Sequence, residues 1–124
     1  MKFHKVDNFK IIGDRDKLIE IFTNLIDNAI KYSDKNKEVS ITFKKEGDSN
    51  IVSVADQGIG IPKEYIHRIT ERFFTVDPSK SRSVGGTGLG LAIVKHLVSQ
   101  HRAEMDISSI ENQGTTIDIK FNAL

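Results

Sequence analysis

The chain of 124 residues contains no cysteine, and its formal net charge at pH 7 is only +1. The absence of cysteine excludes disulfides, thiolate chemistry and cysteine-based zinc sites. A charge so close to zero argues against a nucleic-acid-binding protein that relies on bulk electrostatics, because such domains are strongly basic. No apolar run approaches the roughly 20 residues that a membrane-spanning helix needs, and no signal peptide opens the chain. We therefore expect a cytoplasmic domain that contacts neither nucleic acid nor membrane.

The composition, 38% hydrophobic and 28% charged, is ordinary for a globular fold, and the length fits one domain over residues 1–124. Because a strand-like segment follows the first residues almost at once, we expect a piece of a longer protein. In the first half of the chain, apolar periodicity predicts an extended segment 3–12, a helix from the N-cap Asp14 to about 33, and a hairpin of 39–43 and 51–55. In the second half it predicts a helix after Pro62, a loop 75–87, a helix from about 89 to 101 and a hairpin ending at 121. This order indicates an α+β domain of two layers, with the helices on one face of the sheet.

A glycine-rich run, Gly85 to Gly90, leads directly into the third predicted helix. It is not a P-loop, because the nearest downstream lysine is Lys95, inside the helix. It is not a dinucleotide fingerprint either, since the third glycine position is taken by Leu91 or Ile93. A helix that starts near Gly88 still presents unpaired N–H groups to an anion. The alternative is a flexible loop whose glycines only shape a tight turn.

Two further segments have residue types that suit a nucleotide site. On the first predicted helix, Asn24, Asn28 and Lys31 form a polar row beside the apolar stripe, and amide oxygens with an ammonium suit magnesium and phosphate. The alternative is a row that is merely solvated. Asp56 closes a strand expected to be buried on both faces, and Gly58 and Gly60 follow it. A carboxylate there can accept a hydrogen bond from an exocyclic amine, and the alternative is a turn with an exposed aspartate.

At these residues the sequence resembles the sensor histidine kinases. "NLIDNAIKYS" (24–33), "DQGIGIP" (56–62), "ERFFTVD" (71–77), "GGTGLGLAI" (85–93) and "QGTTI" (113–117) are similar to their N, G1, F, G2 and G3 boxes, in the same order and over essentially the whole chain. The resemblance implies the Bergerat ATP-binding fold of gyrase and MutL: a mixed, mostly antiparallel five-stranded sheet covered by three helices, with the nucleotide on the helix side beneath a mobile ATP lid.

The resemblance implies ATP and Mg²⁺ as ligands and assigns roles to single positions. Asn28 would coordinate the metal with Asn24 beside it, Lys31 would contact phosphate, and Asp56 would read the adenine amino group. The other nucleotide contacts that it implies are Tyr32, Gly58, Gly60, Ile61, Gly86, Thr87, Gly88, Leu89, Gly90 and Thr115. Lys80 and Arg82 would be further phosphate contacts, and Arg72 would either serve the same charge or face the partner domain. The chain departs from the usual pattern at Gln57 in the G1 box and at Thr70 and Thr75 in the F box, where the changes bear on lid docking and partner contact.

The N box also bears on the reaction. ATPase members of the superfamily place a glutamate there as general base, whereas the corresponding residue here is Asn24, which cannot take a proton at neutral pH. Glu20 lies one turn earlier, out of reach. The resemblance therefore implies a nucleophile outside the site, namely a histidine on a separate dimerisation domain. The four histidines present lack the pattern around such a histidine: His4, His67, His96 and His101.

The function predicted from the sequence is that of a protein histidine kinase catalytic domain. It would bind Mg-ATP and transfer the γ-phosphoryl to a histidine of a partner dimerisation domain, with a response regulator downstream. No residue of the chain is then an acid–base catalyst, and Asn24, Lys31 and Arg72 would only position phosphate. Two alternatives stay open: a serine kinase of the anti-sigma type and a nucleotide-binding regulatory module without transfer activity.

Overall fold

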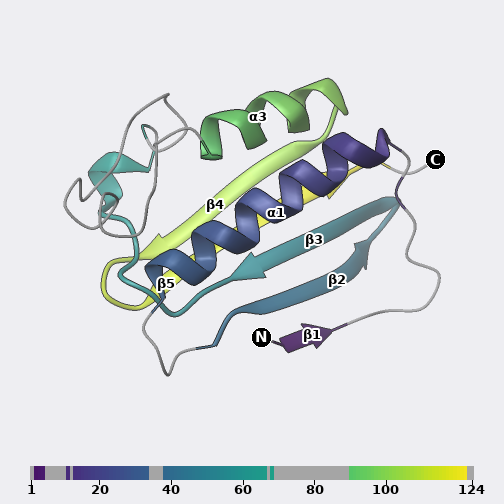
Figure 1. The fold of residues 1–124 in the computed structure, drawn as a ribbon. Coiled ribbons are helices and arrows are strands. Elements are labelled where there is room, and N and C mark those ends of the chain that lie inside the picture. The colour runs from purple at the N-terminus through teal and green to yellow at the C-terminus, as the bar shows by residue number, and fades with distance from the viewer. Residues whose placement is uncertain are drawn as a thin grey trace.

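The computed structural model describes residues 2–4, 11, 13–33, 38–66, 68 and 90–122 (Figure 1). In chain order, the elements are β1 (Lys2–His4), α1 (Arg15–Tyr32), β2 (Ser40–Glu46), β3 (Ser49–Ala55), the 3₁₀ helix η1 (Lys63–Tyr65), α3 (Gly90–Gln100), β4 (Glu104–Ile110) and β5 (Gly114–Phe121). Within these ranges, neither α-helix combines the length and the hydropathy that crossing a membrane requires.

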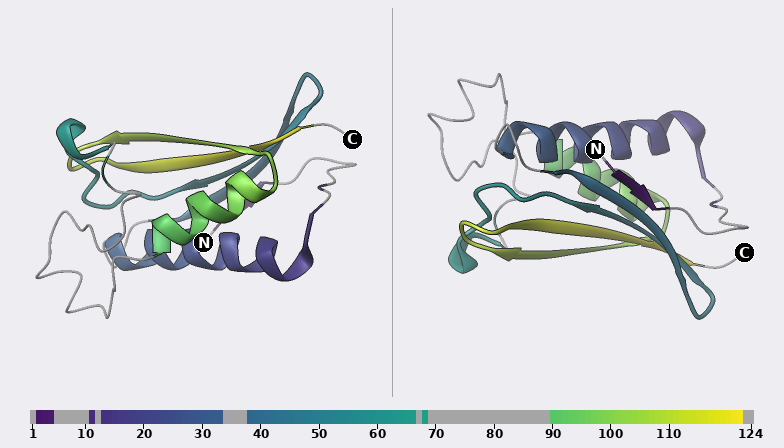
Figure 2. Two further views of the ribbon diagram at one scale, coloured as in Figure 1. Left: turned by 90° about the horizontal axis from the view of Figure 1, so that it is seen from above. Right: turned by 90° about the horizontal axis from the view of Figure 1, so that it is seen from below.

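The strands form one sheet in the order β1-β2-β3-β5-β4. The short β1 pairs in parallel with β2, and the other neighbours, four strands of seven or eight residues, are antiparallel. Figure 2 shows α1 and α3 side by side on one face of this sheet. The structure is therefore the expected α+β sandwich of two layers.

The helical layer differs from the expectation of three helices. In the described ranges it contains two α-helices. The helix that begins directly after Pro62 is the short 3₁₀ helix η1. Most of the predicted helix after Pro62, with Thr70 and Arg72, lies outside the described residues. So do Thr75 and the loop 75–87 that the resemblance assigns to the lid.

Helix α1 forms where the apolar period predicts it. Its start is capped by Asp14, whose Oδ1 accepts a hydrogen bond from the Lys17 N–H at 3.0 Å. Ile21, Leu25 and Ala29 recur at intervals of four residues and are all buried. The N-cap aspartate and the helix end near Ser33 are both confirmed.

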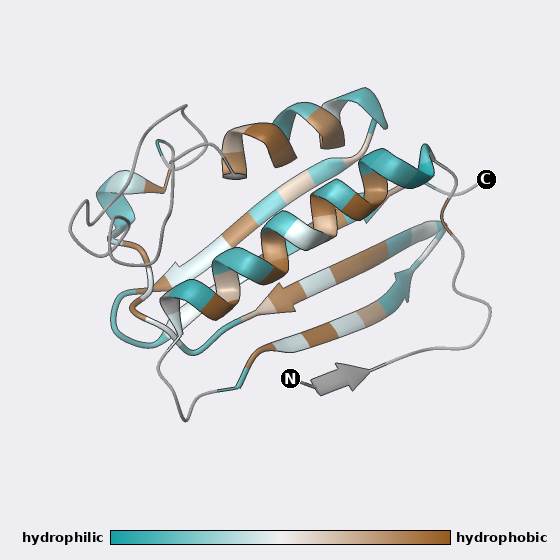
Figure 3. Ribbon diagram, in the orientation of Figure 1, coloured by the Kyte–Doolittle hydropathy of each residue, from teal (hydrophilic) through white to brown (hydrophobic). Residues whose placement is uncertain are grey.

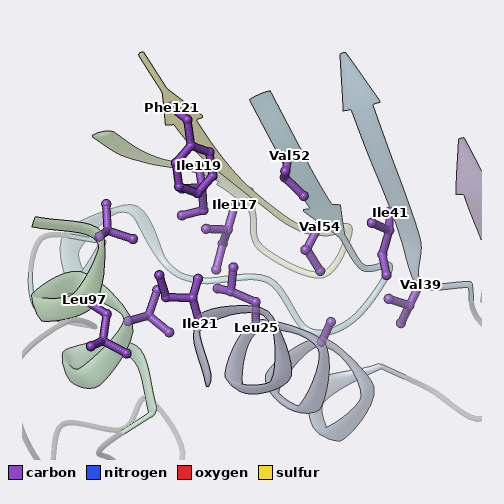
Figure 4. Packing of buried hydrophobic residues seen from close by; sticks show 13 residues of the cluster. Ile21, Leu25, Val39, Ile41, Val52, Val54, Leu97, Ile117, Ile119 and Phe121 are labelled. Atoms are coloured by element: carbon purple, nitrogen blue, oxygen red, sulfur yellow. The ribbon is translucent and has the colours of Figure 1, made fainter. Parts of the chain in front are cut away.

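The core lies between the two helices and the sheet. Figure 4 shows the α1 residues Ile21 and Leu25 pointing toward buried residues of β3 and β5. Figure 3 shows apolar residues alternating with polar ones along the helices and strands. The buried members are Ile21, Leu25, Ala29, Val39, Ile41, Val52, Val54, Val94, Leu97, Val98, Ile117, Ile119 and Phe121. Burial of each large aliphatic side chain stabilises the fold by about 1.5–3 kcal/mol.

A histidine joins the two helices at the end of the molecule where α1 begins. The ring of His101, just after α3, accepts a hydrogen bond from the Asp14 N–H through Nε2 at 3.1 Å, and its Nδ1 lies 2.8 Å from the Leu97 carbonyl oxygen. A Cβ on Gly13 would lie 2.5 Å from the His101 ring, so a larger residue there would displace the ring. His101 therefore connects the start of α1 with the end of α3.

The first hairpin is longer than its apolar pattern indicates. The pattern predicts a turn over the polar run 46–50, but β2 extends to Glu46 and β3 begins at Ser49. Gly47 and Asp48 alone make the turn, with Gly47 at φ +60°. Ile51 to Val54 are buried, which confirms that β3 is covered on both faces.

Candidate nucleotide site

The predicted nucleotide segments meet at one end of the sheet. The C-terminal end of α1, the end of β3, the start of α3 and the turn between β4 and β5 all lie at this end (Figure 1), and the two views of Figure 2 agree. The strand register explains part of this. Ala55, the last residue of β3, pairs with Thr116 near the start of β5, and Thr115 in turn pairs with Ser109. Residues far apart in sequence thereby reach one place.

Asp56 follows β3 directly and is held by the backbone around it. Its Oδ1 accepts hydrogen bonds from the N–H groups of Gly58, at 2.9 Å, and Thr115, at 3.2 Å. Its own N–H donates to the Thr115 carbonyl oxygen at 2.8 Å. The two bonds to Oδ1 orient the carboxylate, and the third holds its backbone. From the described residues no hydrogen bond reaches Oδ2.

The Asp56 carboxyl is also electrostatically unusual. Burial raises its pKa above the ordinary value, and the hydrogen bonds from Gly58 and Thr115 only partly offset this. A carboxyl whose pKa is perturbed by burial and specific partners marks a candidate functional site.

The loop after Asp56 is clamped by the turn between β4 and β5. The Asn112 N–H donates to the Ile59 carbonyl oxygen at 2.6 Å. Gly60, at φ +70°, is so close to this turn that a Cβ would lie 2.2 Å from the Ile110 carbonyl oxygen. Gly114, at φ +138°, is equally tight against the Asp56 carbonyl oxygen, at 2.1 Å. The glycines are therefore required by backbone contact, in addition to any room that they leave for a ligand.

A serine hydroxyl completes the clamp. Ser109 Oγ accepts from the Ile61 N–H at 2.7 Å, donates to the Gly114 carbonyl oxygen at 3.0 Å and lies 2.8 Å from Thr115 Oγ1. Ile61 and Thr115, both predicted to contact the nucleotide, are thus tied to each other through Ser109.

The amide row of α1 lies where the helical spacing placed it. Asn24, Asn28 and Lys31 are all half-buried beside the buried stripe of the helix. The Asn24 side-chain Nδ2 donates to the Glu20 carbonyl oxygen at 2.8 Å, which leaves its Oδ1 to accept other contacts. Among the described side chains, no three His, Asp or Glu residues gather closely enough to hold a metal ion by themselves.

Several predicted contacts lie outside the described residues, namely the Tyr32 side chain, Arg72, Lys80, Arg82, Gly86, Thr87, Gly88 and Leu89. Gly90 is described as the first residue of α3. The structure joins Asp56 directly to Gly58 and Thr115, and links Ile61 to Thr115 through Ser109. Gly60 lies against Ile110 and Glu111 in the turn that leads to Thr115.

Sequence reasoning missed Ser109, although a signal for it was present. Met105 and Ile107 face the helices in β4, so the next position on that face, 109, is expected to be apolar as well. A serine there breaks the alternation. A polar residue at a predicted core position is worth examining as part of a site, because it needs a hydrogen-bonding partner.

Comparison with known proteins identifies the family. Residues 13–123 match the model of the histidine kinase-, DNA gyrase B- and HSP90-like ATPases. The chain belongs to this family. Its resemblance to the histidine kinase boxes is confirmed by the relatives. The sensor-like histidine kinase SenX3 of Mycolicibacterium smegmatis is 42% identical over 111 residues, which are 90% of this chain and 29% of SenX3.

Solved structures of this ATPase family agree. The mycobacterial sensor histidine kinase MprB superposes with a TM-score of 0.82 at 31% identity, over 98% of this chain and 80% of that one. Full-length ShkA, solved in complex with AMPPNP, superposes with a TM-score of 0.77 at 28% identity, over 92% of this chain and 23% of that one. The chain thus spans less than a third of SenX3 and of full-length ShkA.

Proposed function

We propose that this domain binds Mg-ATP and delivers the γ-phosphoryl to a histidine on a separate dimerisation domain, as the catalytic part of a longer, cytoplasmically facing sensor kinase. The observation that carries the proposal is the Asp56 carboxylate. Its Oδ1 is fixed by two backbone N–H groups, and its Oδ2, to which no described residue donates, would accept from an adenine amino group. The histidine kinase relatives support it, and so does the similarity to ShkA, whose structure contains AMPPNP.

The phosphates would lie between the end of α1 and the start of α3. Asn28 and Lys31 are half-buried at that end of α1, and α3 begins at Gly90, where its first N–H groups would face an anion. Mg²⁺ keeps several waters and takes few protein ligands in nucleotide sites. One amide oxygen, that of Asn28, beside phosphate oxygens fits that preference, and the metal would neutralise charge on the transferred group.

Replacing Asn28 tests whether this residue binds the metal or contacts the nucleotide directly. Asn28→Ala should weaken ATP binding about tenfold in the presence of Mg²⁺, the factor that corresponds to the loss of roughly 1.4 kcal/mol. In EDTA the variant and the original chain should bind ATP alike, since the lost contact goes through the metal. Isothermal titration calorimetry in both buffers measures this.

Thr23→Ala is the matched control, because Thr23 is exposed on the same helix. It should bind ATP normally in both buffers. An equal loss for Asn28→Ala with and without Mg²⁺ would remove the metal role from Asn28.

The transfer reaction itself needs two proteins. Mixing the chain with ATP labelled at the γ-phosphate, Mg²⁺ and the histidine-bearing dimerisation domain of a relative such as SenX3 should label that domain. The label should be lost in acid, as phosphohistidine is, and absent when the acceptor histidine is replaced by glutamine. Without an acceptor domain, the release of phosphate should be slow, because Asn24 supplies no general base for water.

The same assay distinguishes the two alternatives. An acid-stable label on a serine would favour the serine kinase of the anti-sigma type. Tight ATP binding with no transfer to any of several dimerisation domains would favour a nucleotide-binding module without transfer activity.

A further inference from the structure

The hydroxyl of Ser109 is surrounded by three groups with different hydrogen-bonding needs. The Ile61 N–H only donates, and the Gly114 carbonyl oxygen only accepts. Thr115 Oγ1 does either. A serine hydroxyl has one proton to donate and two lone pairs that accept.

Only one arrangement of protons satisfies all three partners. The Ser109 proton goes to the Gly114 carbonyl oxygen, and the Ser109 lone pairs accept from the Ile61 N–H and from the Thr115 hydroxyl. If Ser109 donated to Thr115 instead, the Gly114 carbonyl oxygen would lose this bond. Half-buried polar groups favour the arrangement that pairs them all. The Thr115 proton is therefore engaged, and Thr115 Oγ1 presents only lone pairs to any further partner.

Thr115 adjoins Asp56, which is also an acceptor. The Thr115 N–H donates to the side-chain Oδ1 of Asp56 at 3.2 Å, and the Asp56 N–H donates to the Thr115 carbonyl oxygen at 2.8 Å. In the proposed nucleotide site, the Asp56 carboxylate and the hydroxyl of the neighbouring Thr115 would both face the base and would offer it only acceptors. Such an acceptor edge pairs with an amino group, which has two protons to donate, and repels a carbonyl oxygen at the same position of a base.

We propose that Ser109 is a specificity-determining positioning residue: it holds the Thr115 proton, so that the site selects a purine with an amino group at C6 over one with a carbonyl group. The inference rests on the proposed nucleotide site at Asp56. It adds to that proposal a residue that touches no ligand and acts through Thr115.

Inosine triphosphate is the sharpest comparison ligand, because it differs from ATP only at C6 and in the proton on N1. The measured quantity is the ratio of the dissociation constants for Mg-ITP and Mg-ATP, determined by calorimetry on the full chain. The original chain should prefer ATP. In Ser109→Ala, the Thr115 hydroxyl is released to turn and donate to the C6 carbonyl, and the preference for ATP should fall about tenfold, the usual effect of one misplaced hydrogen bond.

Two variants serve as controls. Ser109→Thr keeps the hydroxyl and should restore the preference. Ser108→Ala removes a hydroxyl from the neighbouring, exposed position of β4 and should leave the preference unchanged. A merely structural role for Ser109 would lower stability without changing the ratio, because loss of folded protein weakens the apparent binding of both nucleotides equally.

Thr115→Val keeps the test decisive if Ser109→Ala does not fold. It preserves the shape of the side chain, removes the acceptor and should by itself lower the preference for ATP. An unchanged ratio in a folded Ser109→Ala or in Thr115→Val would overturn the inference, while ATP binding by the original chain would leave the proposed function intact. Failure of the original chain to bind either nucleotide would instead defeat the proposed function.

Discussion

Gly60→Ala is expected to destabilise the domain by about 3 kcal/mol and to weaken ATP binding at least tenfold. The substitution adds two costs. An L-residue at φ +70° is disfavoured by roughly 1–2 kcal/mol, and forcing extra volume into a tight contact costs about 1–3 kcal/mol more. Here the new Cβ would lie 2.2 Å from the Ile110 carbonyl oxygen and 2.8 Å from Glu111 Cα. Because these are backbone atoms, the loop or the turn must move, and the position of the loop relative to Asp56 changes with it.

Gly47 provides a control with the same backbone conformation and no contact. It has φ +60° in the first hairpin, and nothing lies within 4 Å of the position of its Cβ. Gly47→Ala should therefore lower the free energy of unfolding only by about 1 kcal/mol and leave ATP binding unchanged. Urea unfolding of both variants, with calorimetric titration of ATP, makes the comparison. Equal losses of stability in the two variants would show that the contact between the loop and the turn contributes nothing.

The elements that the sequence predicted well are those whose signal is local. Ile21, Leu25 and Ala29 repeat with the helical period, and Asp14 stands where a cap belongs, so the limits of α1 follow from the sequence alone. The ends of the first hairpin do not, because Lys44, Lys45 and Glu46 are exposed and carry no apolar alternation. They are strand residues only because they pair with Ile51, Asn50 and Ser49 of β3.

The site shows the same division between local and long-range information. Asp56, Gly58 and Gly60 are adjacent in one motif, so their association could be predicted from the sequence. The role of Ser109 depends on Ile61, which is 48 residues away, and on the register that places Ser109 opposite Thr115. A sequence pattern does not state which strand crosses which loop. The need for glycine at 60 and 114 likewise comes from contacts between loop and turn that only the folded chain contains.

Asp56→Asn is the second variant with a large expected effect, and it should change binding and stability in opposite directions. Asparagine keeps an oxygen that accepts from the Gly58 and Thr115 N–H groups, but it replaces Oδ2 with an amide that donates. That donor would face the adenine amino group, which is also a donor. ATP affinity should fall about 10- to 100-fold, the range expected for a lost hydrogen bond to a charged group. Calorimetric titration with ATP measures the loss.

The effect on stability follows from the raised pKa of the Asp56 carboxyl. Burial, the largest cause, raises the pKa in the folded state, so folding favours the protonated form over the ionised one. The contribution of this group to stability is fully present below its unfolded pKa, near 3.8, and is lost as the pH rises through the folded value. Above the folded pKa the nucleotide-free domain therefore lacks this contribution and is penalised by the buried carboxylate, a penalty that the neutral side chain of Asp56→Asn removes.

Nucleotide-free Asp56→Asn should consequently unfold at a higher urea concentration than the original chain at pH 7. The advantage should shrink as the pH falls through the folded pKa and vanish well below pH 3.8, where Asp56 is protonated in both the folded and the unfolded state. Asp48→Asn, in the exposed turn of the first hairpin, should show neither the gain in stability nor the loss of ATP binding. If Asp56→Asn bound ATP as tightly as the original chain, Asp56 would be excluded from adenine recognition. Stability gained at pH 7 together with binding lost would mean that the carboxylate is retained for its ligand at the expense of the unliganded fold.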